Sequence, residues 1–175
     1  MEGRETPALE TPELVDQGAP WLRFQVGGHL YAIPLDAVAE VTPAESPRLI
    51  PFVSPEIGGI LNVRGEPVPA VYGGIVLGGA RPRVHRHLMV LERGKLRVGV
   101  LAEEVTTIER GIEPPEEDPD ALEPAGEGAE EFVRWIRHAD GPLGLVAPEG
   151  LLERATAQLE PTRAEGGEEP CQDAF

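Results

Sequence analysis

Apolar and polar residues alternate over several short segments that end at glycine, a pattern typical of a mainly β protein. The clearest case is 21–26, where Trp-Leu-Arg-Phe-Gln-Val alternates as a half-buried strand does. Gly27 and Gly28 separate this segment from 29–33, which predicts a β-hairpin with a glycine turn. Three more hairpins are expected, with strands over 60–63 and 68–71, 87–92 and 96–101, and 132–138 and 143–146.

Helical structure is expected only in short pieces. Leu35, Val38 and Val41 lie three residues apart after Pro34, which favours a helical turn at this point. The remaining elements expected are a Pro- and Ser-rich loop over 42–58, a flexible glycine-rich connection over 73–82, a short helical turn over 102–108 and a helix over 148–158.

The order of these elements repeats along the chain. A hairpin, a helical turn, a loop and a second hairpin occur in 24–71 and again in 88–146. A half of about 60 residues would be marginal alone, so the two halves are expected to share a core. Two pairs of equivalent residues follow from this order, Leu30 with Leu96 and Gly65 with Gly141.

The net charge of −16 lies mostly outside the expected strands. Residues 1–20, 113–131 and 156–175 contain 19 of the 31 acids and two of the 15 bases, which leaves 12 acids and 13 bases elsewhere. We therefore expect disordered acidic tails at 1–20 and 156–175, and an acidic loop at 113–131 within a folded domain over 21–155. A nearly neutral domain lacks the basic surface that binding to nucleic acid requires.

Location is predicted from what the sequence lacks. No apolar run approaches the roughly 18 residues of a membrane span, and the acidic N-terminus is unlike a secretory signal. The single cysteine cannot form an intrachain disulfide. A cytoplasmic protein without membrane insertion is expected.

Residues for catalysis or metal binding are scarce. A nucleophilic enzyme needs an activated side chain beside a base, but Ser46 and Ser54 lie in a Pro-rich loop and Lys95 in a turn. His85 and His87 alternate in an expected strand and could begin a metal site, although a stable site usually needs three or four ligands. No catalytic residue, cofactor or metal is predicted.

Five motifs in order resemble the CheW-like domain of chemotaxis coupling proteins. The resemblance covers about residues 21–155. The motifs are the segment Phe24 to Leu35, the tetrapeptide Val38-Ala39-Glu40-Val41, the stretch Gly58 to Val71, the strand and turn Gly99 to Val105, and the ending Leu145 to Leu152.

The resemblance implies an all-β fold of two fused five-stranded β-barrels related by a pseudo-two-fold axis. It also implies a non-enzymatic adaptor that links chemoreceptors to a CheA-type histidine kinase. Its partners would be the regulatory domain of the kinase and the cytoplasmic tip of methyl-accepting chemoreceptors, in arrays at the inner face of the membrane. Arg64 and Asn62 would then lie at the control surface for these partners, with Val38 and Glu40 near it.

Each of these polar residues also has a simpler interpretation. An arginine fork suits the carboxylates of a receptor tip, but Arg64 could equally be a solvated turn residue. Glu40 could be a surface acid, and Asn62 could satisfy backbone groups of the turn.

An apolar patch is expected where the kinase domain would pack. Val98 with Val100, and Val133 with Trp135, could form an exposed stripe on the second half of the chain. Core packing is the alternative for the aromatic residues on strand patterns.

The sequence departs from the family in several places. Tyr72-Gly73 stands where Asp-Leu is usual, Ala147 stands where Asp is usual, and the acidic loop is long. A divergent scaffold of a motility or gene-regulatory pathway therefore remains an alternative. A small β-barrel enzyme or ligand-binding module is another, and it would need a deep pocket with convergent polar groups.

Overall fold

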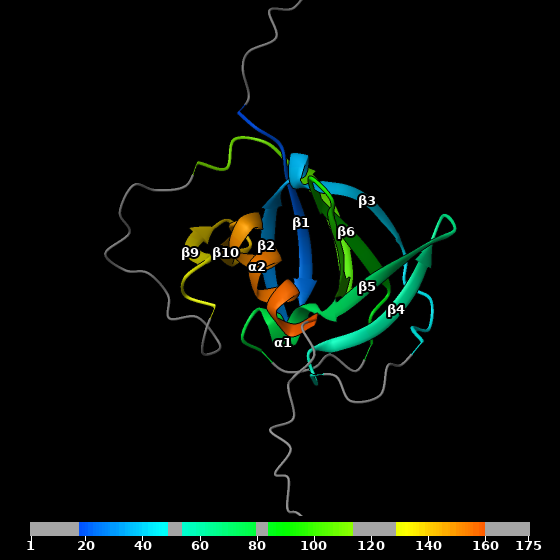
Figure 1. The fold of residues 1–175 in the computed structure, drawn as a ribbon. Helices are drawn as coiled ribbons and strands as arrows, with labels where there is room; N and C mark the ends of the chain where they lie inside the picture. Colours follow the sequence, from blue (N-terminus) through cyan, green and yellow to red (C-terminus); the bar gives the residue numbers. More distant parts are fainter. Residues whose placement is uncertain (1–17, 49–53, 80–83, 114–128, 160–175) are drawn as a thin grey trace, which may run out of the picture.

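A computed structural model describes residues 18–48, 54–79, 84–113 and 129–159 (Figure 1). Every expected strand is present, although most begin or end a few residues from the expected bounds. The elements are β1 (Trp21–Val26), β2 (His29–Pro34), η1 (Leu35–Ala37), β3 (Val38–Pro43), β4 (Ile57–Val63), β5 (Glu66–Tyr72), α1 (Gly73–Val76), β6 (His87–Arg93), β7 (Leu96–Ala102), β8 (Glu104–Glu109), β9 (Val133–His138), β10 (Gly141–Val146) and α2 (Pro148–Leu159).

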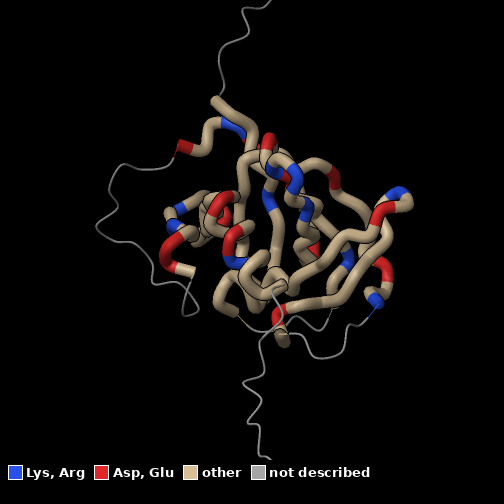
Figure 2. The backbone as a smooth tube through the Cα atoms, viewed as in Figure 1, with Lys and Arg blue, Asp and Glu red and all other residues tan. Residues whose placement is uncertain are grey.

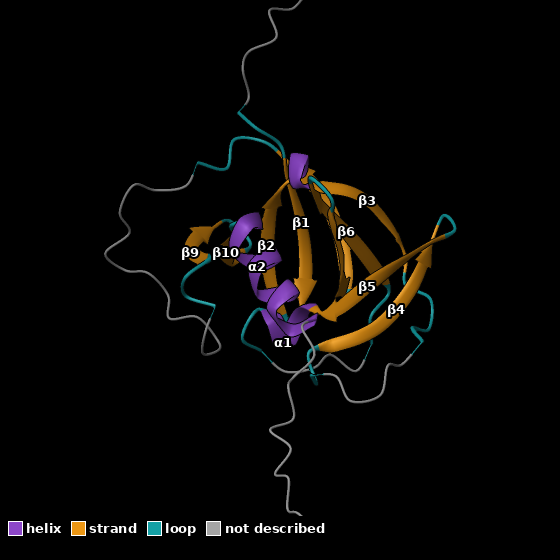
Figure 3. Ribbon diagram, in the orientation of Figure 1, coloured by secondary structure: helices purple, strands orange, loops and turns teal. Residues whose placement is uncertain are grey.

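The strands form two sheets of five, which confirms the all-β prediction (Figure 3). One sheet has the order β8-β1-β2-β10-β9 and is called the β1 sheet below. The other has the order β3-β6-β7-β5-β4 and is called the β6 sheet. In each sheet the two outer strands are not paired with each other. The sheets are therefore not closed into the two β-barrels that the resemblance implied, although the all-β class and the five strands of each unit agree with it.

Each sheet combines strands from both halves of the chain. Replacing β1, β2, β8, β9 and β10 by β6, β7, β3, β4 and β5 converts one strand order into the other. The parallel pairs of the two sheets also have the same register. Leu30 of β2 pairs with Leu143 of β10, and moving three residues along both strands and then to the equivalent residues of the other half gives Gly99 of β7 and Ala70 of β5, which are paired. This register follows from the sequence repeat, so the repeat is real and each half donates three strands to the sheet of the other.

The main core lies between the two sheets. Phe24 in β1 and Met89 and Leu91 in β6 are fully buried in one apolar cluster. Leu151 and Leu152 of α2 belong to the same cluster, and α1 and α2 lie together beside the sheets (Figure 1). The expected shared core is therefore confirmed, and neither sheet buries its central strands without the other.

A second, smaller apolar cluster lines the other face of each sheet, opposite to the main core. This face is called the inner face below. In the β6 sheet it contains Leu61, Val68 and Leu101, and in the β1 sheet it contains Ala32 and Leu143. The central strands are thus buried on both faces, which explains why β6 and β7 have continuous apolar runs and not strict alternation.

Two local expectations were wrong, and a third was right only in part, because the helical turn after Pro34 is present but short. The helical turn ends at Ala37, because the chain from Val38 onward is an edge strand paired with β6. The helical turn expected over 102–108 is the strand β8, which pairs with β1. The glycine-rich connection contains the short helix α1, whose backbone packs so closely that a Cβ at Gly73 would lie 2.8 Å from the Leu101 carbonyl oxygen.

Most of the expected acidic segments lie outside the described residues, including 1–17, 114–128 and 160–175. The expected tail and loop boundaries therefore remain predictions. No helix in the described part of the chain is long and apolar enough to span a membrane.

Candidate functional site

A group of five charged side chains lies at one end of the inner face of the β6 sheet. Arg97 of β7 is its centre and contacts the carboxylates of Glu40, Glu66 and Glu92. Its Nη2 lies 3.2 Å from Glu40 Oε1, and its Nε lies 3.4 Å from Glu92 Oε2. Arg64 donates from Nε to Glu40 Oε2 over 2.8 Å. These five residues are called the Arg97 cluster below.

The cluster presents Arg64 to solvent in a fixed position. Only 13% of the Glu40 side chain is exposed, whereas 81% of the Arg64 side chain is exposed. Glu40 therefore binds the Nε atom of Arg64 and leaves the two terminal nitrogens of the guanidinium group available to a partner. A carboxylate of a partner can reach those nitrogens without breaking the pair with Glu40.

The backbone at Arg64 also restricts the position of this side chain. Arg64 has a φ of 53° and Gly65 a φ of 89°, as in the tight turn that links two hairpin strands. Asn62 accepts a hydrogen bond from the Gly65 amide to Oδ1 over 2.8 Å, which stabilises the turn. A non-glycine residue in the left-handed region is uncommon and is enriched at functional sites.

The structure brings together three of the four residues expected at the control surface. Arg64 and Glu40 are in contact, and Asn62 lies in the same hairpin turn. Val38 is half-buried and packs against the core between the sheets. Val38 pairs with Leu91 and Glu40 with Val90, and a β-bulge lies between them, so Val38 faces the core between the sheets and Glu40 faces the other side of β3.

The expected exposed apolar patch is absent. Val98 and Val100 are fully buried, and Val133 and Trp135 are about as buried, with exposures of 6% and 5%. All four belong to the core between the sheets. The error arose because strands buried on both faces have apolar runs that look like a surplus of exposed apolar residues.

Arg97 was not predicted, although it organises the site. Arg97 lies between Leu96 and Val98, so it points to the same face as Gly99 and Leu101. A charged residue on the inward face of a strand is the signal that could have identified it. Its three acidic partners come from separate strands and could not be assigned from sequence spacing.

The β1 sheet carries a comparable group, called the Arg23 cluster. Arg23 of β1 donates to Glu109 over 3.0 Å and to Asp140 over 2.9 Å. His138 Nε2 lies 2.8 Å from Glu109 Oε1. Acidic and basic residues are interspersed over the described chain, and both kinds lie at the tip of the β4–β5 hairpin (Figure 2).

The histidines considered for metal binding have other partners. His85 packs edge-on against Tyr72 with ring centres 5.7 Å apart, and His87 Nδ1 accepts a hydrogen bond from the Val105 amide over 3.3 Å. Within 18–48, 54–79, 84–113 and 129–159, no group of three or more potential ligands could hold a metal ion.

The family departures lie in structural positions. Tyr72 is buried in the inner cluster of the β6 sheet, directly before α1. Ala147 is exposed, and its carbonyl oxygen accepts the first hydrogen bond of α2 from the Leu151 amide. Neither residue belongs to the Arg97 cluster, so the departures leave that site unchanged.

Comparison with known proteins gives a consistent result. The family model described as a CheW-like domain matches residues 20–156. Among solved structures, the scaffolding protein TtCheW from Thermoanaerobacter tengcongensis is similar, with 19% identity and a TM-score of 0.58. The match covers 74% of this chain and 89% of that one. No curated protein matches this chain.

The structural likeness supports the fold, and the family match extends over most of the sequence. The match also includes every residue of the Arg97 cluster. The chain therefore belongs to the CheW-like domain family, whose members are non-enzymatic scaffolds of chemotaxis signalling.

Proposed function

We propose that this protein is a cytoplasmic adaptor that couples methyl-accepting chemoreceptors to the regulatory domain of a CheA-type histidine kinase. The observation that carries the proposal is Arg64, which is held by Glu40 and is 81% exposed at the tip of a hairpin. Family membership supplies the class of partner. The adaptor would work at receptor arrays on the inner face of the membrane.

The physical case rests on a preorganised cation. A solvated arginine loses side-chain entropy when a partner binds it, whereas Arg64 already has one nitrogen anchored by Glu40. Glu40 is itself held by Arg97, so the position of Arg64 depends on the whole cluster. A glutamate on a receptor tip or on the kinase domain would complete the unpaired side of the guanidinium group.

Signal transfer would follow from a difference in affinity. An adaptor that binds one receptor state more tightly than another shifts the equilibrium of the bound kinase between its active and inactive states. Val38, Glu40 and Asn62 would contribute by supporting Arg64, and not all of them need to touch a partner.

Pull-down with a receptor tip fragment and with the kinase regulatory domain tests the proposal. The wild type should retain both partners, and Arg64→Asn should lose at least one. Asparagine suits the left-handed turn, so this variant removes the guanidinium group while keeping the hairpin. Arg64→Lys is the matched control for charge without the planar fork. Binding of neither partner by the wild type would contradict the proposal.

A divergent adaptor of another chemosensory pathway is a second candidate. It is favoured by Tyr72-Gly73 and Ala147, where the family usually has other residues. The same pull-down distinguishes the two, because a divergent adaptor would bind receptors or kinases from a motility or gene-regulatory system in place of the chemotaxis pair.

A further inference from the structure

Two cavities lie next to each other along α2. One has a volume of about 350 Å³ and extends to Asp36 of η1, and the other has a volume of about 520 Å³ and extends to Leu96 at the start of β7. Arg93, Glu149 and Leu152 line both cavities. The two cavities therefore form one continuous surface hollow, which is called the α2 groove below.

One wall of the α2 groove is a single face of the helix. Glu149, Leu152, Glu153, Thr156 and Ala157 line the groove and recur at intervals of three or four residues. Side chains at this spacing lie on the same side of a helix, and this face is about 12 Å long. The wall therefore matches about two turns of a second helix that lies alongside it.

The floor of the groove is apolar, whereas its walls carry an excess of acid. Leu152 belongs to the main core, and Leu96 packs against that core. Asp36 and Glu153 are exposed, and neither forms an ion pair with another residue in the described part of the chain. The lining residues include four acids and, among the described residues, a single base, Arg93.

This base forms an ion pair at the point where the two cavities meet. Arg93 Nη1 lies 3.2 Å from Glu149 Oε1, and the two side chains are 64% and 57% exposed. An ion pair as exposed as this contributes little to stability, so a cation of a partner can take the place of Arg93 at low cost.

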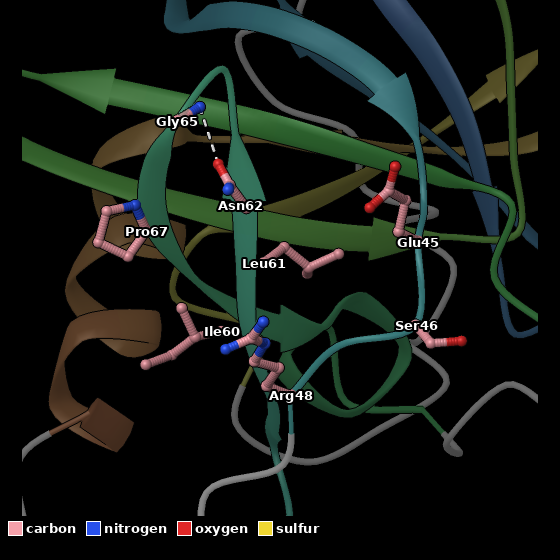
Figure 4. A pocket seen from close by; sticks show the side chains of 8 residues that line it. All are labelled: Glu45, Ser46, Arg48, Ile60, Leu61, Asn62, Gly65 and Pro67. Atoms are coloured by element: carbon pink, nitrogen blue, oxygen red, sulfur yellow. Dashed lines mark hydrogen bonds between the residues drawn. The ribbon is translucent and has the colours of Figure 1, made fainter.

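The cavity beside Asn62 in the β6 sheet shows no such preference for one sign of charge. Its volume is about 400 Å³, and its lining includes one acid, Glu45, and one base, Arg48 (Figure 4). Two backbone hydrogen bonds between Arg48 and Ile60, both of 3.0 Å, join its two walls. Charge therefore indicates a class of partner for the α2 groove and not for this cavity.

We propose that the α2 groove binds an amphipathic helix of a partner protein, with basic residues on both sides of its apolar stripe. The apolar stripe would lie on Leu96 and Leu152, as in other complexes of a helix in a groove. Basic residues one turn apart would pair with Glu149 and Glu153 on one side, and another would pair with Asp36 on the other side.

The chain itself is a poor source of this helix. Residues 160–175, which follow α2 directly, contain five acids and one base, and the whole chain has a net charge of −16. Neither Arg64 nor Arg97 lines the groove, so binding of the helix can be tested independently of coupling between a receptor and a kinase.

The probe is the acetylated and amidated peptide AAALKAKLKALKAA. Its leucines form one stripe of a helix with lysines on both sides, and alanine, leucine and lysine all favour the helix. One control peptide has glutamate in place of lysine. A second control has the same composition, in an order that spreads the leucines around the helix.

The test is an NMR titration of the full chain at about 0.15 M salt, where long-range attraction to the acidic chain is screened. The lysine peptide should give saturable shifts centred on the amides of Leu96, Glu153 and Ala157, and both control peptides should bind about tenfold more weakly or less. Absence of saturable shifts at these amides, or equal binding of the peptide with spread leucines, would overturn the proposal.

Two single substitutions separate the groove from the overall charge. Glu153→Lys places a cation on the groove wall, whereas Glu104→Lys makes the same change in charge on β8, outside the groove. Both side chains are exposed, so both variants should fold. Glu153→Lys should weaken binding of the lysine peptide about fivefold or more, and Glu104→Lys less than about twofold. Equal weakening would mean that the peptide responds only to net charge, which would overturn the proposal.

Substitution of Arg93 should have the opposite effect. Arg93→Ala frees the Glu149 carboxylate and joins the two cavities, so the lysine peptide should bind about threefold more tightly. Lys95→Ala is the matched control, because it removes the same charge two residues away and this side chain lines neither cavity. If Arg93→Ala does not bind the peptide more tightly than Lys95→Ala, the assignment of the groove is wrong.

A second copy of the chain is the competing occupant. It would appear as concentration-dependent dimerisation without peptide that Glu153→Lys changes and Glu104→Lys does not. That result would assign the groove to self-association and overturn the proposal of a basic partner.

Discussion

The two sheets share one strand order, yet their charged clusters differ in what they expose. In the β1 sheet, Arg23 is 11% exposed, and it joins Glu109 to Asp140. In the β6 sheet, Arg97 is 26% exposed, and the cluster continues outward to Arg64. A repeated fold has thus produced one cluster that mainly links strands and one that also presents a cation to a partner.

The difference arises at equivalent turns. Gly65 and Gly141 are equivalent in the repeat, and each follows the residue that extends its cluster, Arg64 in one sheet and Asp140 in the other. Asp140 is bound by Arg23 from within the sheet, whereas Arg64 extends from the pair with Glu40. One turn residue therefore changes a structural link into a candidate binding site.

The largest expected effect tests whether the sheets fold as one unit. Phe24→Ala in the β1 sheet should cost about 3–5 kcal/mol and Leu91→Ala in the β6 sheet about 2–5 kcal/mol, because both side chains are fully buried. Urea unfolding followed by circular dichroism should show a single transition for each variant. Two separate transitions would mean that the sheets do not share a core.

The next effect distinguishes the central arginines of the two clusters. Arg23→Met and Arg97→Met should each cost about 1–3 kcal/mol, since each removes charged hydrogen bonds while keeping the apolar stem. Arg97→Met leaves three carboxylates with Arg64 as their only remaining cation in the cluster. The stability lost in Arg97→Met should therefore be smaller in about 1 M salt, because salt screens the repulsion among these carboxylates. An equal salt response from the two variants would contradict this difference.

A pH effect of intermediate size is expected in the β1 sheet. Burial raises the pKa of Tyr31 to about 12. Tyr31 packs against Phe24 and Trp135 in the core, with ring centres 5.6 and 5.3 Å away. Above pH 10 the unfolded chain loses this proton before the folded chain does, so stability should fall as pH rises from 10 to 12.

At pH 11 this group should lower the free energy of unfolding by about 1.4 kcal/mol relative to neutral pH. Tyr31→Phe keeps the ring and removes the titrating group, so it is the matched control. Thermal melts at pH 7.5 and pH 11 measure the difference. If Tyr31→Phe and the wild type lose the same stability, titration of Tyr31 makes no contribution.

The smallest effect on stability is expected at Arg64. Its side chain is mostly exposed, so Arg64→Ala should change the free energy of unfolding by about 0.5 kcal/mol or less. Coupling should fail although the melting temperature barely moves. A large drop in melting temperature would mean that Arg64 is structural, like Arg23.

Alternation and turn glycines were enough to predict the hairpins, and the order of elements was enough to predict the repeat. The short segments 38–41 and 102–108 were misassigned, because spacing over a few residues does not distinguish an edge strand from a helical turn. Arg64, Glu40 and Asn62 came from the family motif. The exchange of strands between halves, and with it the partnership of Arg97 with Glu40 and Glu66, depends on long-range pairing that local patterns do not encode.

Reconstitution of kinase activity tests the adaptor most directly. A receptor and a CheA-type kinase are combined with no adaptor, with the wild type, or with Arg64→Asn. We predict that receptor control of phosphorylation requires the wild-type chain and is lost with the variant. Receptor control without this chain, or full control with Arg64→Asn, would contradict the account.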